Sequence, residues 1–188
     1  MKSLLLSLFI GSAMMLNAAT ITVQNTNNTG AGSLRDAISS ASAGDIIRFN
    51  PTLINSGSDT ILLTSEILFA KNLTFIGLYN ATDTLFISGG NTNRVLYADL
   101  GTSTVKNIVL DSMVIIDGNS NFGGGIRVTD GDSVKVFNSI IANSSGSGGG
   151  GGIAMNSTSA IYMSIENSSL YGNTSAGRGG AVHCQSAV

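Results

Sequence analysis

A phrase that recurs three times in the second half of the chain constrains the fold more than any other feature. Each copy runs from strand-like apolar residues into an Asn, then a Ser- or Gly-rich stretch, a Gly cluster and a short apolar tail. The copies begin at Ile115, Ile140 and Ser169. Repetition of this kind is the signature of an array of similar units, and no helical pattern separates the copies. The sequence therefore predicts a parallel β-solenoid with one coil for each copy.

The apolar tails and the Gly clusters mark the expected repeat positions. The tail residues Ile126, Ile153 and Val182 follow one another at nearly equal steps. The Gly residues that precede them are Gly124, Gly125, Gly151, Gly152, Gly179 and Gly180. We interpret these clusters as turns, because a phosphate-binding loop would need a Lys, a Ser or Thr and a following helix.

The Asn residues of the three copies are Asn119, Asn143 and Asn173, whose steps along the chain are less even than those of the tails. We expect them at one corner of consecutive coils. Asn tolerates the left-handed conformation that a corner needs, and stacked amides can bond to the amides above and below. The sequence thus predicts an Asn ladder along one edge of the solenoid.

The first residues have the pattern of a secretory signal. Lys2 is followed by an apolar run from 4 to 15, and small residues between 16 and 19 offer a cleavage site. The run is shorter than the roughly 20 residues that a bilayer requires. We predict a signal peptide over 1–19, no transmembrane segment in the chain, and a secreted or cell-surface protein of the bacterial outer membrane.

One helix is expected, directly after a short strand that begins the mature chain. Ser33 followed by Asp36 is close to a capping box, and Leu34, Ala37, Ile38 and Ala41 fall on one helical face. Gly44 is placed to end this helix. An open solenoid end exposes strand edges that need a cover. We therefore expect residues 20–44 to form an N-terminal strand and a capping helix.

Residues 45–188 are predicted to form the coils of the solenoid. Short runs rich in β-branched and aromatic residues alternate here with Gly, Asn, Asp and Ser. The predicted strands are 46–49, 60–63, 73–76, 85–87, 95–97, 108–110, 113–116, 134–137 and 161–165. A β-sandwich would accommodate as many strands, but it does not repeat the same corner. At about 25 residues per coil, this region holds roughly six coils.

Composition excludes several classes of partner. The net charge is −2, and nine Lys and Arg are scattered among eleven Asp and Glu, so no basic patch marks a nucleic-acid interface. Cys184 and His183 are the single residues of their types. One Cys rules out an internal disulfide framework, and the pair cannot form a zinc site. The two are neighbours, so on a strand they would point to opposite faces, and we interpret Cys184 as a small buried core residue. We expect no cofactor and no metal.

The chain resembles secreted bacterial right-handed parallel β-helix proteins. The resemblance lies in GAGSLRDAI from Gly30, AGDIIRF from Ala43, ILFAKNLTFIG from Ile67 and LFISGGNTNRVL from Leu85. The three later phrases are similar to the GGAI and FxxN repeats of polymorphic outer membrane proteins, although apolar residues other than Phe precede the Asn in the later two. The resemblance implies an all-β, right-handed parallel β-helix of the pectin lyase-like fold. It also implies a surface or secreted protein, such as an adhesin-like passenger domain that binds a glycan or a host or neighbouring cell.

An enzyme is the alternative function, since parallel β-helices also include pectate lyase-like enzymes and polysaccharide hydrolases. A lyase needs carboxylates for calcium and a base, for which Asp117, Asp130, Asp132 and Arg127 are the candidates. We interpret Asp130 to Asp132 as a polar turn. A hydrolase needs two facing carboxylates, and the acidic residues are too scattered to nominate a pair. No catalytic residue is therefore predicted.

The printed sequence stops at Val188 within a predicted strand and without a closing cap. An open solenoid end invites aggregation. We expect the coils to continue in a longer protein, with an anchoring domain downstream.

Overall fold

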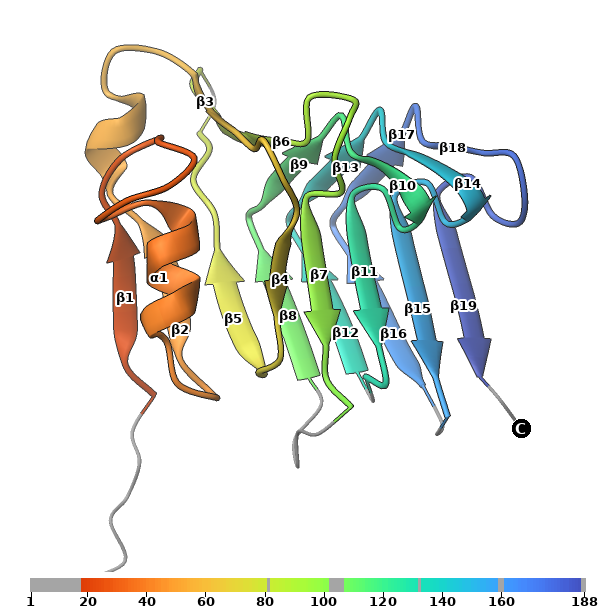
Figure 1. Ribbon diagram of the computed structural model, residues 1–188. Coiled ribbons are helices and arrows are strands. Elements are labelled where there is room, and N and C mark those ends of the chain that lie inside the picture. The colour runs from red at the N-terminus through yellow and green to blue at the C-terminus, as the bar shows by residue number, and fades with distance from the viewer. Residues whose placement is uncertain (1–17, 81, 102–106, 132, 159–160, 187–188) are drawn as a thin grey trace, which may run out of the picture.

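The computed structural model describes residues 18–80, 82–101, 107–131, 133–158 and 161–186, which form a parallel β-solenoid of about six turns (Figure 1). All pairs between its named strands are parallel, and each coil contributes one strand to each of several sheets. The predicted all-β solenoid is confirmed. Asp132, one of the acidic candidates, lies outside the described residues, as does the predicted signal peptide up to residue 17.

Four sheets wrap around the core. The back sheet has the order β1 (Thr20–Val23), β2 (Ile46–Phe49), β5 (Leu73–Ile76), β8 (Asn107–Asp111), β12 (Ser133–Phe137) and β16 (Tyr162–Glu166). The upper sheet consists of β3 (Asp59–Leu62), β6 (Leu85–Ser88), β9 (Val114–Ile116), β13 (Ile140–Ala142) and β17 (Ser169–Tyr171). The front sheet consists of β4 (Ile67–Phe69), β7 (Leu96–Asp99), β11 (Ile126–Thr129), β15 (Ile153–Ser157) and β19 (Val182–Ser186). A small sheet joins β10 (Asn119–Phe122), β14 (Ser145–Gly149) and β18 (Thr174–Ser175) between the upper and front sheets.

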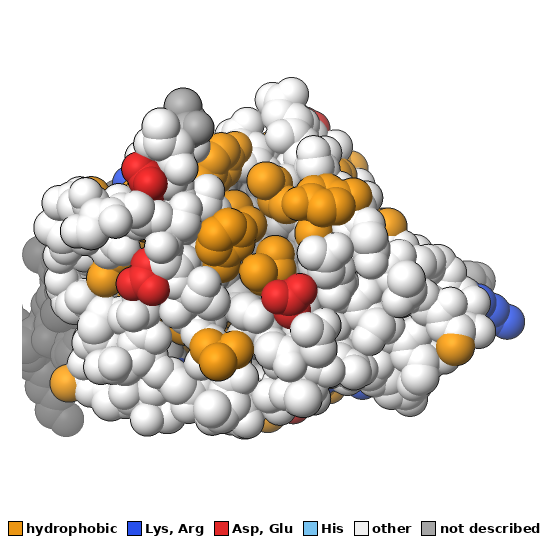
Figure 2. Space-filling view, turned by 90° about the horizontal axis from the view of Figure 1, so that it is seen from above, with side chains coloured by type: hydrophobic (Ala, Val, Ile, Leu, Met, Phe, Trp, Pro, Cys, Tyr) orange, Lys and Arg blue, Asp and Glu red, His pale blue; other side chains and the backbone are white. Residues whose placement is uncertain are grey.

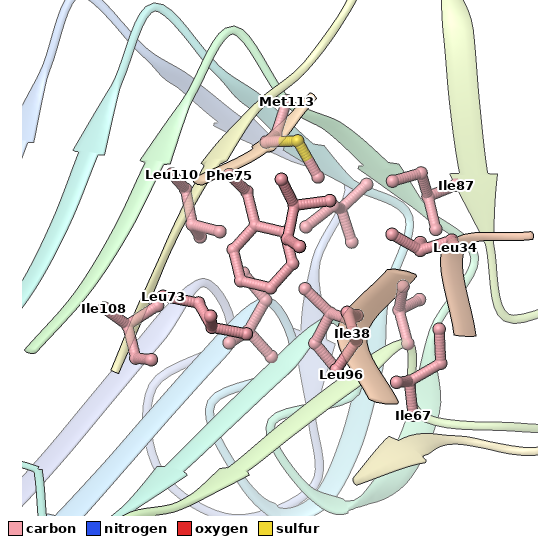
Figure 3. Close-up of a cluster of buried hydrophobic side chains, with 14 of the residues drawn as sticks. Leu34, Ile38, Ile67, Leu73, Phe75, Ile87, Leu96, Ile108, Leu110 and Met113 are labelled. Carbon is pink, nitrogen blue, oxygen red and sulfur yellow. The ribbon is translucent and has the colours of Figure 1, made fainter. Parts of the chain in front are cut away.

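The core is a set of files in which inward side chains of successive coils lie opposite one another. Ile61, Ile87, Ile115 and Ile141 form such a file in the upper sheet, and each is almost completely buried. Figure 3 shows Ile87 with residues from the other sheets around the ring of Phe75. A coil buries its apolar face only when a neighbouring coil stacks on it, so stability grows with the number of coils in contact.

The helix α1 (Leu34–Ser40) packs its apolar face into this core, near β1 and β4 (Figures 1 and 3). Its buried residues are Leu34, Ala37 and Ile38, as the sequence predicted. Ser33 is the N-cap, and its hydroxyl accepts a hydrogen bond from the Asp36 amide. The prediction that Gly44 ends the helix is wrong. The chain turns to an extended conformation at Ala41, whose amide closes the last helical turn onto the Ala37 carbonyl, so no left-handed residue is needed there.

The predicted apolar strands agree with strands of the structure to within two residues at each end, whereas β4 and the small sheet were not predicted. β14 has the sequence SGSGG, which carries no apolar alternation and was interpreted as a turn. It is held as a strand by pairing with β10 and β18 on its two sides. A short 3-10 helix, η1 (Pro51–Ile54), also follows β2 and buries Ile54.

Candidate functional site

The apolar tails of the repeat face one another in the front sheet. The register pairs Ile126 with Ile153 and Ile153 with Val182. Ile126 and Ile153 are fully buried, and Val182 is half-buried because it belongs to the last described coil. These residues are therefore core positions that hold the front sheet in register.

The Gly clusters lie at the tight corner before the front sheet. Two positions before the tail residues, Gly124 is aligned with Gly151 and Gly180. One position before them, Gly125 is aligned with Gly152. A Cβ at Gly151 would lie 2.1 Å from the Thr174 carbonyl oxygen and 2.6 Å from that of Gly180. The neighbouring coil thus leaves no room for a side chain. Gly179 aligns one position earlier, with Gly150, and both have positive φ.

The three Asn residues share a corner but do not form the predicted ladder. Ile116, Ala142 and Tyr171 are in register across three successive coils. Asn119, Asn143 and Asn173 lie three, one and two positions after these register residues. The Asn residues therefore belong to different files, and side chains in different files cannot stack on one another.

Each Asn instead stabilises the corner in its own way. The Asn173 amide group donates to the Ile141 carbonyl at 2.7 Å, and its oxygen accepts from the Ser144 amide at 3.0 Å. The Asn119 amide group donates to the Asn91 carbonyl at 2.9 Å. Only Asn143 of the three adopts the left-handed conformation, with φ 55°. Two of the Asn side chains therefore tie one coil to the coil before it.

The candidate lyase residues do not converge. Asp117 follows β9 in the upper sheet, where it accepts a hydrogen bond from the Ser88 hydroxyl. Asp130 follows β11 at the far end of the front sheet, and Arg127 lies within β11. In Figure 1, β9 lies along the upper edge of the solenoid and β11 runs down to the lower edge, so Asp117 after β9 and Asp130 after β11 are at opposite edges.

The outward face of the front sheet brings together an arginine, aromatic rings and a histidine that sequence reasoning did not associate. Tyr97, Arg127, Ala154 and His183 occupy one outward file. The Arg127 guanidinium lies 5.3 Å from the centre of the Tyr97 ring and 5.6 Å from that of Phe122. The Phe122 ring stacks on His183 at 6.2 Å. We call Tyr97, Phe122, Arg127 and His183 the Arg127 cluster.

Arg94 lies beside the Arg127 cluster and is itself buried. It forms an ion pair with Glu66, and its Nε donates to the carbonyl oxygens of Phe122 and Gly123 at 3.2 Å each. Burial lowers the pKa of Arg94, and the nearby Glu66 carboxylate opposes that shift. Since Glu66 and Gly123 belong to different coils, Arg94 fastens the corner and helps to fix the position of Phe122.

A second outward file of polar residues runs beside the Arg127 cluster. Asp99, Thr129, Asn156 and Gln185 face one another in register. The Thr129 hydroxyl donates to the Asp99 carboxylate at 3.0 Å. We call these four residues the polar file. Three residues of the polar file also line a pocket of about 280 Å³, namely Thr129, Asn156 and Gln185. Residues 130, 157 and 158 complete the lining.

Two features in or near this pocket are notable for their chemistry. The side-chain oxygen of Asn156, which lines the pocket, is buried and has no hydrogen-bond partner among the described residues. The carboxylates of Asp99 and Asp130 both face Gly101, at 3.8 and 3.2 Å from the position a Cβ would take there. This pair of carboxylates was not anticipated, because the two residues belong to successive coils and are far apart in sequence.

His183 and Cys184 point to opposite faces of β19. His183 faces outward onto Phe122, and Cys184 is in the inward file with Met155, its sulfur 3.9 Å from that of Met163. The prediction that Cys184 is buried is wrong, because no described coil stacks on β19 beyond it and the residue is exposed. Within the described ranges, no three His, Cys, Asp or Glu residues lie close enough to hold a metal ion.

These features define a parallel β-solenoid with a polar and aromatic outer face on its front sheet. Neither a known family, by its sequence model, nor a curated protein matches this chain. No helix among the described residues has both the length and the apolar character needed to cross a bilayer.

Proposed function

We propose that the protein is a secreted or cell-surface β-helix domain of the adhesin-like passenger type, with a binding or stalk role and no catalysis. The observation that carries the proposal is the front face, where the Arg127 cluster and the polar file run side by side across successive coils. The same proposal includes four further points: residues 1–19 direct export, the solenoid is right-handed, α1 caps its end, and the chain is related to polymorphic outer membrane proteins.

The chemistry of this face suits a glycan. Hydroxyl, amide and carboxylate groups of the polar file can exchange hydrogen bonds with sugar hydroxyls. Aromatic rings such as Tyr97 and Phe122 offer apolar surfaces for the C–H faces of sugar rings. Strands of neighbouring coils are about 4.8 Å apart, so equivalent side chains recur along the solenoid and contact a polymer at several points. Each contact is weak, and several together give useful affinity.

The test is binding of neutral and acidic oligosaccharides to the purified chain, measured by glycan array and then by calorimetry. We expect Thr129→Ala with Gln185→Ala to weaken binding about tenfold, because hydrogen bonds to the ligand are lost. Lys135→Ala, an exposed change on the back sheet, is the matched control and should leave binding unchanged. Equal binding by all three proteins would exclude the front face as the binding surface.

A carbohydrate-active enzyme is the second candidate, and the Asp99–Asp130 pair favours it. Glycoside hydrolysis uses a pair of carboxylates. Asp99 and Asp130 bring two carboxylates to the same position beside Gly101. Incubation with pectic and other polysaccharides, followed by assays for new reducing ends and for unsaturated products, tests this directly. Turnover that is abolished by both Asp99→Asn and Asp130→Asn would replace the binding proposal with an enzyme. Absence of turnover on all substrates would leave binding as the function.

A further inference from the structure

The outward face of the upper sheet is unusually apolar. This sheet turns one file into the core, made up of Ile61, Ile87, Ile115, Ile141 and Leu170. The positions directly before and after this file face outward. One outward file runs Leu62, Ser88, Ile116, Ala142, Tyr171 in register. The other runs Thr60, Phe86, Val114, Ile140, Ser169. The loop residue Tyr79 lies at the edge of this face, where its hydroxyl donates to the Asn138 carbonyl.

Ser88, Val114 and Ala142 of these two files are buried, but other residues of the files are open to solvent. Leu62 is 54% exposed and Tyr171 is 57% exposed. Phe86, Ile116 and Ile140 are partly exposed between them. In Figure 2, which views the solenoid from above, hydrophobic side chains gather over the middle of the face. A contiguous apolar area on a protein surface commonly marks a site of interaction. We call Leu62, Tyr79, Phe86, Ile116, Ile140 and Tyr171 the upper patch.

Among the described residues, three acidic side chains border the upper patch. Asp59 begins β3, Asp83 lies two residues before β6, and Asp117 directly follows β9. Within the described parts of the chain, these three carboxylates have no ion-pair partner, and the five strands of the sheet contain no Lys or Arg. Figure 2 shows red carboxylates around the patch and no blue side chain within it. The face therefore combines an apolar centre with a negative rim.

We propose that the upper patch docks a basic amphipathic helix of a partner protein. Such a helix places its apolar residues on the patch and its Lys or Arg side chains beside the three Asp residues, so that both features of the face are matched. Five strands at about 4.8 Å spacing span roughly 19 Å. A helix of about 13 residues covers that length. This surface is separate from the front face, and the inference stands independently of the function proposed there.

Two other occupants fit the face less well. A second copy would dock through a two-fold contact that brings the same acidic rims together, and like charges oppose it. A glycan would need flat aromatic surfaces at the centre of the patch. The centre here holds Ile116 and Ile140. Tyr171 lies at one end, and Tyr79 lies along one edge, where its hydroxyl is bonded to the Asn138 carbonyl.

The experiment measures binding of a labelled helical peptide of about 14 residues, composed of Leu and Lys in an amphipathic pattern, by fluorescence anisotropy. The same peptide with Glu in place of Lys is the charge control. The test variant is L62S/Y171S. The matched control is L68S/Y162S, which changes a Leu and a Tyr that are each 58% exposed on other sheets. All four positions are exposed, and circular dichroism checks that the variants fold.

We expect L62S/Y171S to weaken binding about tenfold, because exposed apolar contacts at both ends of the patch are lost, while L68S/Y162S binds as the unchanged protein does. D59N/D83N/D117N should weaken binding and reduce its salt dependence. The proposal is overturned if both double variants weaken binding equally, if the Glu peptide binds as well as the Lys peptide, or if the unchanged protein shows no saturable binding. A neutral oligosaccharide whose binding requires Leu62 and Tyr171 would also overturn it, in favour of a glycan site.

Discussion

At the residue scale, the alternation of buried and outward positions in β9 decides what a substitution does. Ile115 has no exposed surface and lies between Ile87 and Ile141, whereas its neighbour Ile116 faces outward. We expect Ile115→Asp to lower the free energy of unfolding by about 4 kcal/mol, because a carboxylate would be buried without a partner. Ile116→Asp is the control and should cost less than about 1 kcal/mol. Urea unfolding of both variants measures the difference, and equal losses would mean that the strand register is wrong.

Some positions of the repeat require glycine because the neighbouring coil leaves no space for a side chain, and others require it for the turn geometry. At Gly151, a methyl group would overlap backbone oxygens of the neighbouring coil, which cannot move without breaking the sheet. We expect Gly151→Ala to cost about 3 kcal/mol in urea unfolding. Gly30→Ala is the comparison, since nothing lies within 4 Å of its added Cβ and only its positive φ opposes the change. That variant should lose about 1 kcal/mol. A loss at Gly151 no greater than at Gly30 would contradict the crowding argument.

At the element scale, the sequence predicted most strands in which buried apolar residues alternate with outward residues. It did not predict β14, which is held as a strand only by backbone pairing with its neighbours. β2, β5 and β12 carry buried apolar residues at every second position, so their patterns are visible. β14 has no such pattern, and only the strands on either side of it define it. The polar file was also invisible, because outward residues such as Asp99 and Gln185 are united by register and not by any local motif.

The helix α1 depends on its N-cap for its first turn. The Ser33 hydroxyl accepts from the Asp36 amide at 3.2 Å, and the Asp36 carboxylate accepts from the Gly32 amide at 2.9 Å. We expect Ser33→Ala to lower stability by about 1 kcal/mol in thermal or urea unfolding. Ser40→Ala, at the other end of the helix, is the control and should change stability little. An unchanged midpoint in Ser33→Ala would show that tertiary packing alone fixes the helix.

At the scale of the whole molecule, the spacing of the repeats is uneven, and this explains why the solenoid was predictable but the Asn ladder was not. A strand can be predicted from the local alternation of apolar residues, and this alternation does not depend on the length of the loops. A ladder requires each Asn to lie at the same distance in sequence from the register residue of its coil, whereas Asn119, Asn143 and Asn173 lie three, one and two positions after theirs. Ile116, Ala142 and Tyr171 are in register, but fewer residues separate the first two than the last two. Successive coils therefore contain different numbers of residues.

The two ends of the back sheet should differ in local stability. Both β1 and β16 pair with one strand only among the described residues, but α1 lies against β1, where Val23 is fully buried. In β16, Ile165 is 38% exposed and Met163 is half-buried. Because local opening is easiest where few apolar contacts are lost, we expect β16 amides to exchange hydrogen faster than β1 amides, with β8 and β12 slowest. Hydrogen–deuterium exchange followed by mass spectrometry measures this order. Equal exchange in β1 and β16 would mean that α1 does not protect its end, and the capping role would have to be abandoned.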